Sequence, residues 1–424
     1  MKNMGNTRIS EMAENLQGSE IIKLAGEIKE KMAQGEKIYN FTIGDFDPKV
    51  FPIPTELTEA IINAYENGET NYPAANGIAE LRAAVAKFVK DRLNLDYSAD
   101  EFLIAGGARP LIYAAYQALV NPGEKVVFPV PSWNNNHYSH LSAAEKVMIE
   151  TAAENNFMPT AEELIPHLSE AGLVALCSPL NPTGTVFTAG GLKAICEAIV
   201  AENNRRGPNE KPVYLLYDQI YWVLTHGDTT HVNPVEVCPE VKPYTLFIDG
   251  LSKAFAATGV RVGWAFGPKK IINAMKSILG HIGAWSPKAE QVATATYLNL
   301  NGEVENYLTG FKSDLNDRLL AFYDGIQNLK DKGYNVDAIH PQAAIYLTVK
   351  FDIQGQTTTD GHVLETVEDV CAYLLNEAKL AVVPFYAFGA SQTSPWFRLS
   401  VGTSTLDSIA ACFTQLEHAL EKLT

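Results

Sequence analysis

Short apolar runs recur between residues 102 and 267, and they constrain the fold of this chain more than any other feature. Helical patterns separate several of these runs, for example at residues 110–120 and 192–203. Strands that alternate with helices predict crossover connections, and therefore an α/β fold with a mainly parallel sheet and helices on both faces. The runs that we interpret as buried strands are FLIA at 102–105, KVVFPV at 125–130, LVALC at 173–177, VYLLY at 213–217, TLFI at 245–248 and VGWAFG at 262–267.

The remainder of the chain has a different pattern, which predicts a smaller α+β domain. Residues 303–332 have the charged amphipathic pattern of one long helix, and AIYLTVKF, a helix at 362–379, AVVPF and FRLSVG follow it. A helical segment at 17–34 lies outside the sheet region, so we expect the N-terminal residues to complete the smaller domain. The predicted parts are an N-terminal segment of the small domain at 1–49, a large α/β domain at 50–300 and a small C-terminal α+β domain at 301–424.

Charge and composition argue against several classes of partner. The chain has 33 Lys and Arg residues against 49 Asp and Glu residues, a formal net charge of −16, and no local basic patch, so we expect no nucleic acid partner. Residues 1–20 lack the apolar core of a signal peptide, and no later stretch reaches the roughly 18 apolar residues of a membrane span. Five scattered cysteines without C-x-x-C spacing are typical of reduced thiols. These features predict a cytoplasmic protein, and the histidines lack the neighbours that a metal site needs.

Glycines and polar residues follow the predicted strands directly, at the edge where open α/β sheets bind ligands. The segment GGARP at 106–110 precedes a helix, and its exposed N–H groups favour an anion such as phosphate. Neither of the glycine-rich nucleotide motifs occurs, so the sequence does not support NAD or a nucleoside triphosphate. Taken singly, the two glycines also fit an ordinary turn, Trp133 a core position, and Asn181 a simple loop.

Two charged residues at strand ends carry more information. Asp218 ends the run VYLLY, and a carboxylate there is costly to bury without a cationic or hydrogen-bonding partner. Lys253 follows TLFI in a loop of small residues, eight positions before Arg261, which is bracketed by two valines with glycines beyond them. A solvated lysine is the ordinary alternative. Because this loop carries so little other charge, we favour Lys253 as a buried nucleophile.

Four motifs together resemble the fold-type I pyridoxal-phosphate aminotransferases, the aspartate aminotransferase superfamily. The motifs are SPLNPTG, DQIY, GLSKAFAATGVRVGW and WFRLSVG, and their order and spacing match from about residue 40 to 402. The resemblance implies pyridoxal 5′-phosphate as cofactor, an amino acid and a 2-oxo acid such as 2-oxoglutarate as substrates, and a homodimer. It also implies a ping-pong Schiff-base mechanism.

The resemblance further implies a role for each matching residue. Lys253 would form the Schiff base and carry the proton, Asp218 would keep the ring nitrogen protonated, and Arg398 would bind the substrate α-carboxylate as a bidentate fork. The other implied contacts are Asn181 and Tyr221 at the ring hydroxyl, Ser252, Arg261 and the backbone of Gly107, Ala108 and Arg109 at the phosphate, Trp133 stacked on the ring, Gly44 over the substrate, and Tyr72 reaching the phosphate in the partner subunit.

Two departures from the family pattern leave the amino donor open. Arg109 follows an alanine where many relatives have a hydroxyl or amide side chain, and segment 280–287 lacks the arginine that some dicarboxylate-specific relatives present. Either Arg109 turns inward to pair with a distal carboxylate, or Trp133, Trp285 and Tyr386 line an apolar pocket for aromatic or large neutral donors. The run WNNNH at 133–137 resembles dicarboxylate-specific relatives more, so we lean toward aspartate. A pyridoxal-phosphate-dependent lyase on the same fold would use the same residues.

Overall fold

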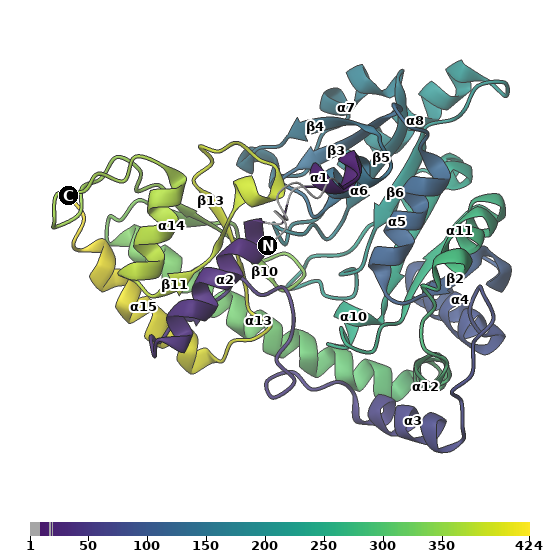
Figure 1. Ribbon diagram of the computed structural model, residues 1–424, viewed down its shortest axis with the longest axis horizontal. Coiled ribbons are helices and arrows are strands. Elements are labelled where there is room, and N and C mark those ends of the chain that lie inside the picture. Colours follow the sequence, from purple (N-terminus) through teal and green to yellow (C-terminus); the bar gives the residue numbers. More distant parts are fainter. Residues whose placement is uncertain (1–8, 17, 19) are drawn as a thin grey trace, which may run out of the picture.

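The computed structural model describes residues 9–16, 18 and 20–424, and a seven-stranded sheet forms the centre of its larger part, on the right of Figure 1. The strands are β2 (Phe102–Ala105), β3 (Lys125–Val130), β4 (Glu145–Glu150), β5 (Ala171–Cys177), β6 (Tyr214–Asp218), β7 (Thr245–Gly250) and β8 (Gly263–Phe266). Their order is β2-β8-β7-β6-β5-β3-β4. Strand β8 runs antiparallel to both of its neighbours, and the other pairs are parallel. The predicted α/β class with a mainly parallel sheet is therefore confirmed.

Helices cover both faces of this sheet, as the alternating pattern predicts. One face packs against α5 (Ala108–Leu119) and α11 (Lys269–Ile282). The opposite face packs against α4 (Ala79–Leu93), α7 (Ala161–Leu168) and α8 (Ala189–Arg206). The remaining helices of this part are α3 (Thr55–Glu66), α6 (Asn135–Leu141), α9 (Pro234–Val237), α10 (Leu251–Ala254) and α12 (Lys288–Leu298), with 3-10 turns η1 (Ala99–Glu101), η2 (Ala153–Asn155) and η3 (Pro239–Tyr244).

The sequence patterns did not reveal β4, which is the outer strand beyond β3. Its sequence EKVMIE carries three charged residues, and most of its side chains are exposed, including Met148. An edge strand pairs on one side only and is commonly charged, so it lacks the continuous apolar run that marks a central strand. The six strands that the sequence did predict are all present within one or two residues of their expected limits.

The smaller part, on the left of Figure 1, contains two further sheets. An antiparallel sheet has the order β12-β13-β10-β9, and β1 pairs in parallel with β11. These strands are β1 (Tyr39–Asn40), β9 (Val336–Ala338), β10 (Tyr346–Phe351), β11 (Leu380–Ala381), β12 (Val383–Pro384) and β13 (Trp396–Ser400). The helices are α2 (Glu20–Ala33), α13 (Asn301–Asp331), α14 (Val367–Asn376) and α15 (Leu406–Leu420), with the turn η4 (Phe385–Phe388). The short helix α1 (Glu11–Glu14) instead lies beside α6 of the larger part, where the carbonyl oxygen of Met12 is 2.7 Å from Nε2 of His140.

The N-terminal segment packs on elements from the far end of the chain. Ile28 of α2 lies in one apolar cluster with Leu375 of α14, and β1 adds to β11. The helix predicted at 17–34 is present as α2, and its positions 17 and 19 lie outside the described residues. Helix α13 has 31 residues and runs beneath both parts in Figure 1, so it connects the large part to the small one. The domain boundaries proposed at residues 49 and 300 stay a prediction. Within the described ranges, no helix is long and apolar enough to cross a membrane.

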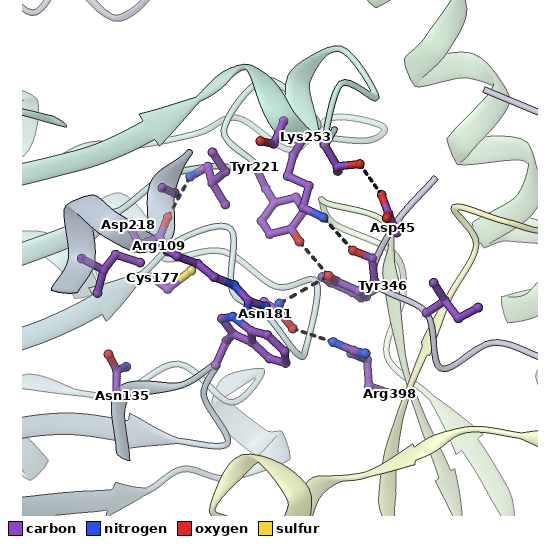
Figure 2. Close-up of a pocket in the computed structure, with 18 of the residues that line it drawn as sticks. Asp45, Arg109, Asn135, Cys177, Asn181, Asp218, Tyr221, Lys253, Tyr346 and Arg398 are labelled. Carbon is purple, nitrogen blue, oxygen red and sulfur yellow. Dashed lines mark hydrogen bonds between the residues drawn. The ribbon is translucent and has the colours of Figure 1, made fainter. Parts of the chain in front are cut away.

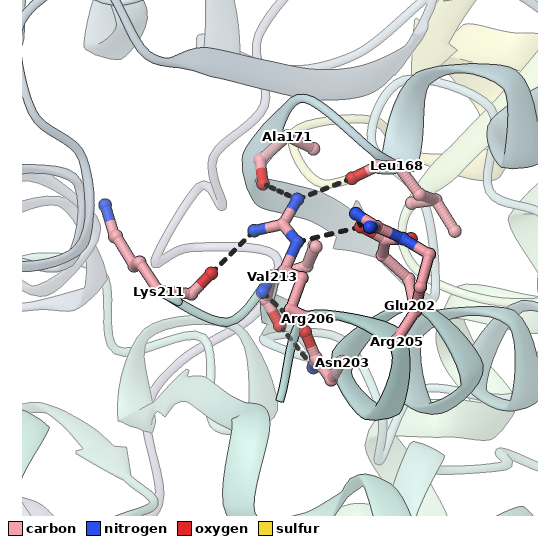
Figure 3. Close-up of polar contacts among 8 residues, drawn as sticks. All are labelled: Leu168, Ala171, Glu202, Asn203, Arg205, Arg206, Lys211 and Val213. Atoms are coloured by element: carbon pink, nitrogen blue, oxygen red, sulfur yellow. Dashed lines mark hydrogen bonds and ion pairs between the residues drawn. The ribbon is translucent and has the colours of Figure 1, made fainter. Parts of the chain in front are cut away.

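A polar cluster at the end of α8 holds the first residues of β5 and the approach to β6 in place (Figure 3). The nearly buried side chain of Arg206 donates hydrogen bonds to the carbonyl oxygens of Leu168 and Ala171 at 2.7 and 2.9 Å. Asn203 bonds both the N–H and the carbonyl oxygen of Val213, at 2.7 and 3.0 Å. These hydrogen bonds anchor the amino ends of β5 and β6, and both strands run from this cluster toward the carboxyl-end side of the sheet.

Candidate active site

A cavity of about 720 Å³ opens beyond the carboxyl ends of the large-sheet strands and is closed on its other side by β10 and β13. This volume suits a cofactor together with a small substrate. Gly107 lies beside the cavity at the start of α5, whereas Tyr72 lies outside it and is 82% exposed. The cavity lining includes all the other residues to which the family resemblance gives a role, which are Gly44, Ala108, Arg109, Trp133, Asn181, Asp218, Tyr221, Ser252, Lys253, Arg261 and Arg398.

Lys253 lies on the short helix α10, directly after β7, and its amine points into the cavity (Figure 2). Its Nζ donates a hydrogen bond to the carbonyl oxygen of Gly44 at 2.6 Å. Burial lowers the pKa of Lys253 to about 8; Asp45 acts in the opposite direction, and the cavity arginines, Arg398 first, lower the pKa further. A neutral amine is the nucleophilic form, so Lys253 is prepared for covalent chemistry near neutral pH.

We expect Lys253 in cofactor-free protein to react with an acylating reagent with a pH midpoint near 8, well below the ordinary 10.5 of lysine. Removing the charge of Asp45 with Asp45→Asn should lower this midpoint further, because Asp45 stabilises the protonated amine. Competitive labelling followed by peptide mass spectrometry measures both midpoints, with exposed lysines as the internal control. A midpoint shared with the exposed lysines would contradict the burial argument.

Asp218 ends β6 and faces the cavity from the sheet. Its Oδ1 accepts a hydrogen bond from the backbone N–H of Ile220 at 3.1 Å, and no ion pair of Asp218 occurs among the described residues. Burial raises the pKa of Asp218 to about 6. The sequence predicts a cationic or hydrogen-bonding partner for Asp218, and the partner found within the chain is this backbone N–H. A buried carboxylate of this kind favours a cationic ligand group beside it.

The start of α5 forms an anion-binding cradle with Arg261. Gly107 has a φ of 98°, and a Cβ there would lie 2.2 Å from Nη2 of Arg261, so the position requires glycine. Arg261 itself has a φ of 61°, an uncommon value for a residue with a side chain, and it donates to the carbonyl oxygen of Gly106 at 2.7 Å. Gly107 caps α5 without a side-chain hydrogen bond, which leaves the first helical N–H groups open to an anion.

Arg398 lies on the opposite side of the cavity, on β13, and is only 2% exposed. Its Nη1 donates to Oδ1 of Asn181 at 3.0 Å, and its Nη2 donates to the carbonyl oxygen of Thr42 at 2.7 Å. Its Nε has no hydrogen-bond partner among the described residues. Because a buried guanidinium without a counter-charge is costly, this position suits a carboxylate ligand.

Arg109 crosses the cavity, and the alternative aromatic pocket does not form. Figure 2 shows the Arg109 side chain extending from α5 toward Asn181, and its guanidinium lies 5.3 Å from the centre of the Trp133 ring. Trp285 instead packs against Tyr72, with ring centres 5.2 Å apart, and Tyr386 lines a separate cavity beside α2 and α14. The interpretation of Trp133, Trp285 and Tyr386 as one apolar pocket within the chain is therefore wrong.

Tyr346 and Asp45 belong to the site although the sequence analysis did not select them. Tyr346 begins β10, and its hydroxyl lies 2.6 Å from that of Tyr221. Oδ1 of Asp45 accepts a hydrogen bond from the Thr258 hydroxyl at 2.6 Å, which ties the N-terminal segment to the loop after Lys253. Tyr346 opens β10, and Asp45 follows the two-residue strand β1, which the sequence analysis did not predict, whereas the search concentrated on residues that follow the predicted strands. In the sequence, Asp45 is marked only by the preceding Gly44, and Tyr346 only by its position in the predicted strand AIYLTVKF.

The two buried histidines, His226 and His231, lie within the packed protein and do not line the cavity. Burial lowers the pKa of His226 to about 4 and that of His231 to about 3, so both rings are neutral. Nε2 of His226 lies 2.8 Å from the carbonyl oxygen of Ala344, a contact that fastens the loop after Tyr221 to the segment before β10. In the described part of the chain, no three histidine, cysteine or acidic side chains are grouped to hold a metal ion.

A lysine, a cradle of open helical N–H groups, a buried carboxylate and a buried arginine surround one cavity. Comparisons with known proteins show the family of the chain that carries this cavity. The family "Aminotransferase class I and II" matches residues 36–412. An aspartate aminotransferase of Geobacillus stearothermophilus is 31% identical over 418 residues, covering 98% of this chain and 99% of the relative. The chain belongs to the class I and II aminotransferase family, whose aspartate aminotransferase members depend on pyridoxal phosphate, and it is a transaminase.

Solved structures share this fold over nearly the whole chain. The aspartate aminotransferase from Rhizobium meliloti superposes with a TM-score of 0.90 at 28% identity, covering 99% of this chain and 100% of that structure. The aspartate aminotransferase from Thermus thermophilus, solved with maleate, gives a TM-score of 0.84 at 26% identity, covering 98% and 100%. The large sheet with its smaller companion is thus the architecture of these enzymes.

Proposed function

We propose that this chain binds pyridoxal 5′-phosphate at Lys253 and moves the amino group of aspartate to a 2-oxo acid such as 2-oxoglutarate. The observation that carries the proposal is a single cavity lined by Lys253, with its lowered pKa, by the unpaired Asp218 and by the buried Arg398. The residues fit the cofactor: the cradle at Gly107 suits its phosphate, and the carboxylate of Asp218 suits its ring nitrogen. Transfer of labelled nitrogen from aspartate to a 2-oxo acid tests this proposal directly.

When bound, pyridoxal phosphate supplies an electron sink for the negative charge that develops at the substrate Cα. Arg398 binds the α-carboxylate and thereby orients the Cα–H bond, a contribution of position rather than of chemistry. The Nζ of Lys253, neutral above about pH 8, would accept the proton from Cα and deliver it to the cofactor carbon C4′, and it would carry out the reverse transfer in the second half of the cycle. Asp218 would keep the ring nitrogen of the cofactor protonated.

The remaining contacts proposed for the cofactor follow from the positions of the lining residues. Gly44 would cover the substrate: its carbonyl oxygen already accepts from Lys253, and a Cβ there would lie 2.7 Å from the Tyr346 hydroxyl. The side chains and amides proposed for the cofactor are Ser252, Arg261 and the backbone of Gly107, Ala108 and Arg109 at the phosphate, Trp133 on the ring face, and Asn181 and Tyr221 at the ring hydroxyl.

Aspartate is the proposed donor because Arg109 offers a second cation for a distal carboxylate. Its side chain extends toward Asn181, which is itself bound to Arg398, so the two guanidinium groups flank one region of the cavity. The competing aromatic pocket lacks Trp285 and Tyr386. The Thermus thermophilus relative, whose solved structure contains the dicarboxylate maleate, also supports an acidic substrate.

Arg109→Ala should lower kcat/KM for aspartate by about tenfold to a hundredfold, because one charge-assisted bond to the distal carboxylate is lost. A neutral amino acid should be affected much less. Arg109→Lys is the matched control, since it keeps the charge and should recover part of the loss. Steady-state rates with both donors measure the difference. Equal losses for the two donors would place Arg109 on the cofactor phosphate instead.

A homodimer is the proposed assembly, located in the cytoplasm. Ile62, Tyr65, Tyr72 and Ile282 are exposed apolar side chains of α3, of the loop after it and of the end of α11, and such a group suits a subunit interface. Tyr72 points outward, consistent with a contact to the phosphate in a partner subunit. The five cysteines are free thiols, which suits a reducing compartment. Sedimentation equilibrium should give twice the chain mass, and a monomer would contradict the assembly.

A further inference from the structure

Tyr346 reaches the cavity from the small sheet, and two glycines define its place. Its side chain is 2% exposed, and it pairs with Ser400 in the register of β10 and β13. A Cβ on Gly44 would lie 2.7 Å from the Tyr346 hydroxyl, and a Cβ on Gly184 would lie 2.3 Å from its carbonyl oxygen. The absence of these two side chains therefore allows both the phenol and the backbone of Tyr346 to sit where they do.

The phenol group of Tyr346 contacts three residues around the cavity (Figure 2). Its oxygen lies 2.6 Å from the hydroxyl oxygen of Tyr221 and accepts from Nδ2 of Asn181 at 3.3 Å. The ring centre lies 4.6 Å from the guanidinium carbon of Arg398. Tyr346 thus joins the arginine on the substrate side to the two side chains proposed for the ring hydroxyl of the cofactor.

Arg398 fixes the direction of the two hydrogen bonds that Asn181 makes. Arg398 has donors only, so the atom of Asn181 that faces it must be the carbonyl oxygen. The amide nitrogen of Asn181 must then face Tyr346 and donate to its oxygen. The Tyr346 oxygen keeps a second acceptor position, so either hydroxyl of the Tyr346–Tyr221 pair can be the donor at 2.6 Å. When Tyr346 donates, the proton of Tyr221 is free to point into the cavity.

We propose that Tyr346 is a positioning residue that makes Tyr221 a hydrogen-bond donor to the cavity. The inference rests on the proposed function, because the oxygen that receives this bond would be the ring hydroxyl oxygen of pyridoxal phosphate. A hydroxyl that accepts one hydrogen bond donates a stronger one, so Tyr346 also favours the ionised form of that oxygen. Tyr346 acts through Tyr221 and needs no contact of its own with the cofactor.

Tyr346→Phe removes the hydroxyl and keeps the ring under Arg398. In cofactor-loaded protein, the pH midpoint of the visible absorbance of the cofactor should rise by about 0.5 to 1 pH unit, because Tyr221 becomes a weaker and less directed donor. With aspartate, kcat should fall about tenfold while KM changes by less than about threefold, because Arg398 keeps its other contacts. A merely structural role of Tyr346 would leave the absorbance midpoint unchanged.

Two further variants make the test specific. Tyr297→Phe on α12 also removes a buried phenol oxygen, but that oxygen has no hydrogen-bond partner among the residues that the structure describes. The absorbance midpoint of this variant should therefore match that of the wild-type protein. The double variant Tyr221→Phe with Tyr346→Phe should have the midpoint of Tyr221→Phe alone, since the second hydroxyl acts only through the first. An unchanged midpoint in Tyr346→Phe, or additive shifts in the double variant, would overturn the inference. Wild-type protein without any titrating absorbance would overturn the proposed function as well.

Discussion

Lys253→Ala is expected to reduce turnover by roughly four orders of magnitude or more, because in the proposed mechanism this one side chain both holds the cofactor covalently and transfers the proton. Cofactor should still bind noncovalently, since the cradle formed by Gly107 and Arg261 does not involve Lys253. Turnover assays together with equilibrium dialysis of the cofactor measure the two effects separately. Lys269→Ala, at an exposed lysine outside the cavity, is the control and should be fully active.

Chemical trapping gives the site of attachment. Borohydride reduction of the loaded wild-type protein should fix the cofactor to the peptide that contains Lys253, and peptide mapping identifies that residue. Attachment to any other lysine would sink the assignment of Lys253. The wild-type protein should be yellow before reduction, and Lys253→Ala should lose the covalent label but not the bound cofactor.

Asp218→Asn is expected to slow the proton-transfer half-reaction by about a hundredfold to ten-thousandfold while changing cofactor retention much less. The amide can still accept the hydrogen bond from Ile220 at the end of β6, so the local fold should persist. It cannot balance a positive charge on the ring nitrogen, and the electron sink is weakened as a result. Rapid-mixing measurement of the half-reaction with aspartate determines the rate.

A second variant separates the effect of the negative charge of Asp218 from the effect of its side-chain shape. Asp218→Glu keeps the carboxylate and should retain more activity than Asp218→Asn, although its longer side chain alters the distance. Near-normal half-reaction rates in Asp218→Asn would show that this carboxylate does not serve the ring nitrogen. The pKa of Asp218, raised to about 6 by burial, should fall when cofactor binds, because a neighbouring cation favours the carboxylate.

The cavity has a local charge opposite to that of the whole chain. The formal net charge is −16, yet Arg109, Arg261, Arg398 and Lys253 all line one cavity. Charges in a partly buried cavity are screened less than surface charges, so this lining can attract a phosphate and a carboxylate even though the chain as a whole is acidic. The acidic net charge, which argues against a nucleic acid partner, is therefore compatible with anionic small molecules in the cavity.

The sequence predicted those parts of the site that depend on local order along the chain. Asp218 and Lys253 directly follow buried strands, and parallel strands bring their carboxyl ends to one edge, so their meeting could be expected. Arg398 could be placed only through the family resemblance, because β13 belongs to another sheet. The sequence alone does not state how the two sheets face each other.

The errors and omissions share a physical cause. Trp285 was considered, by residue type, for an alternative apolar pocket, but its ring packs on Tyr72, a contact between segments far apart in sequence. Tyr346 was read as an ordinary strand residue, because only the approach of β10 to the turn at Gly184 brings its hydroxyl to Tyr221. Strand β4 was missed because an edge strand carries charge where a central strand is apolar.

Nitrogen transfer from aspartate tests the central claim most directly. Cofactor-loaded protein is incubated with aspartate labelled with heavy nitrogen and with 2-oxoglutarate, and the label is followed by mass spectrometry in glutamate and in ammonia. We predict that the label moves to glutamate only when 2-oxoglutarate is present, and that phenylalanine is a slower donor than aspartate. Release of labelled ammonia without an acceptor would indicate lyase chemistry and contradict the account, and faster transfer from phenylalanine would contradict the acidic substrate.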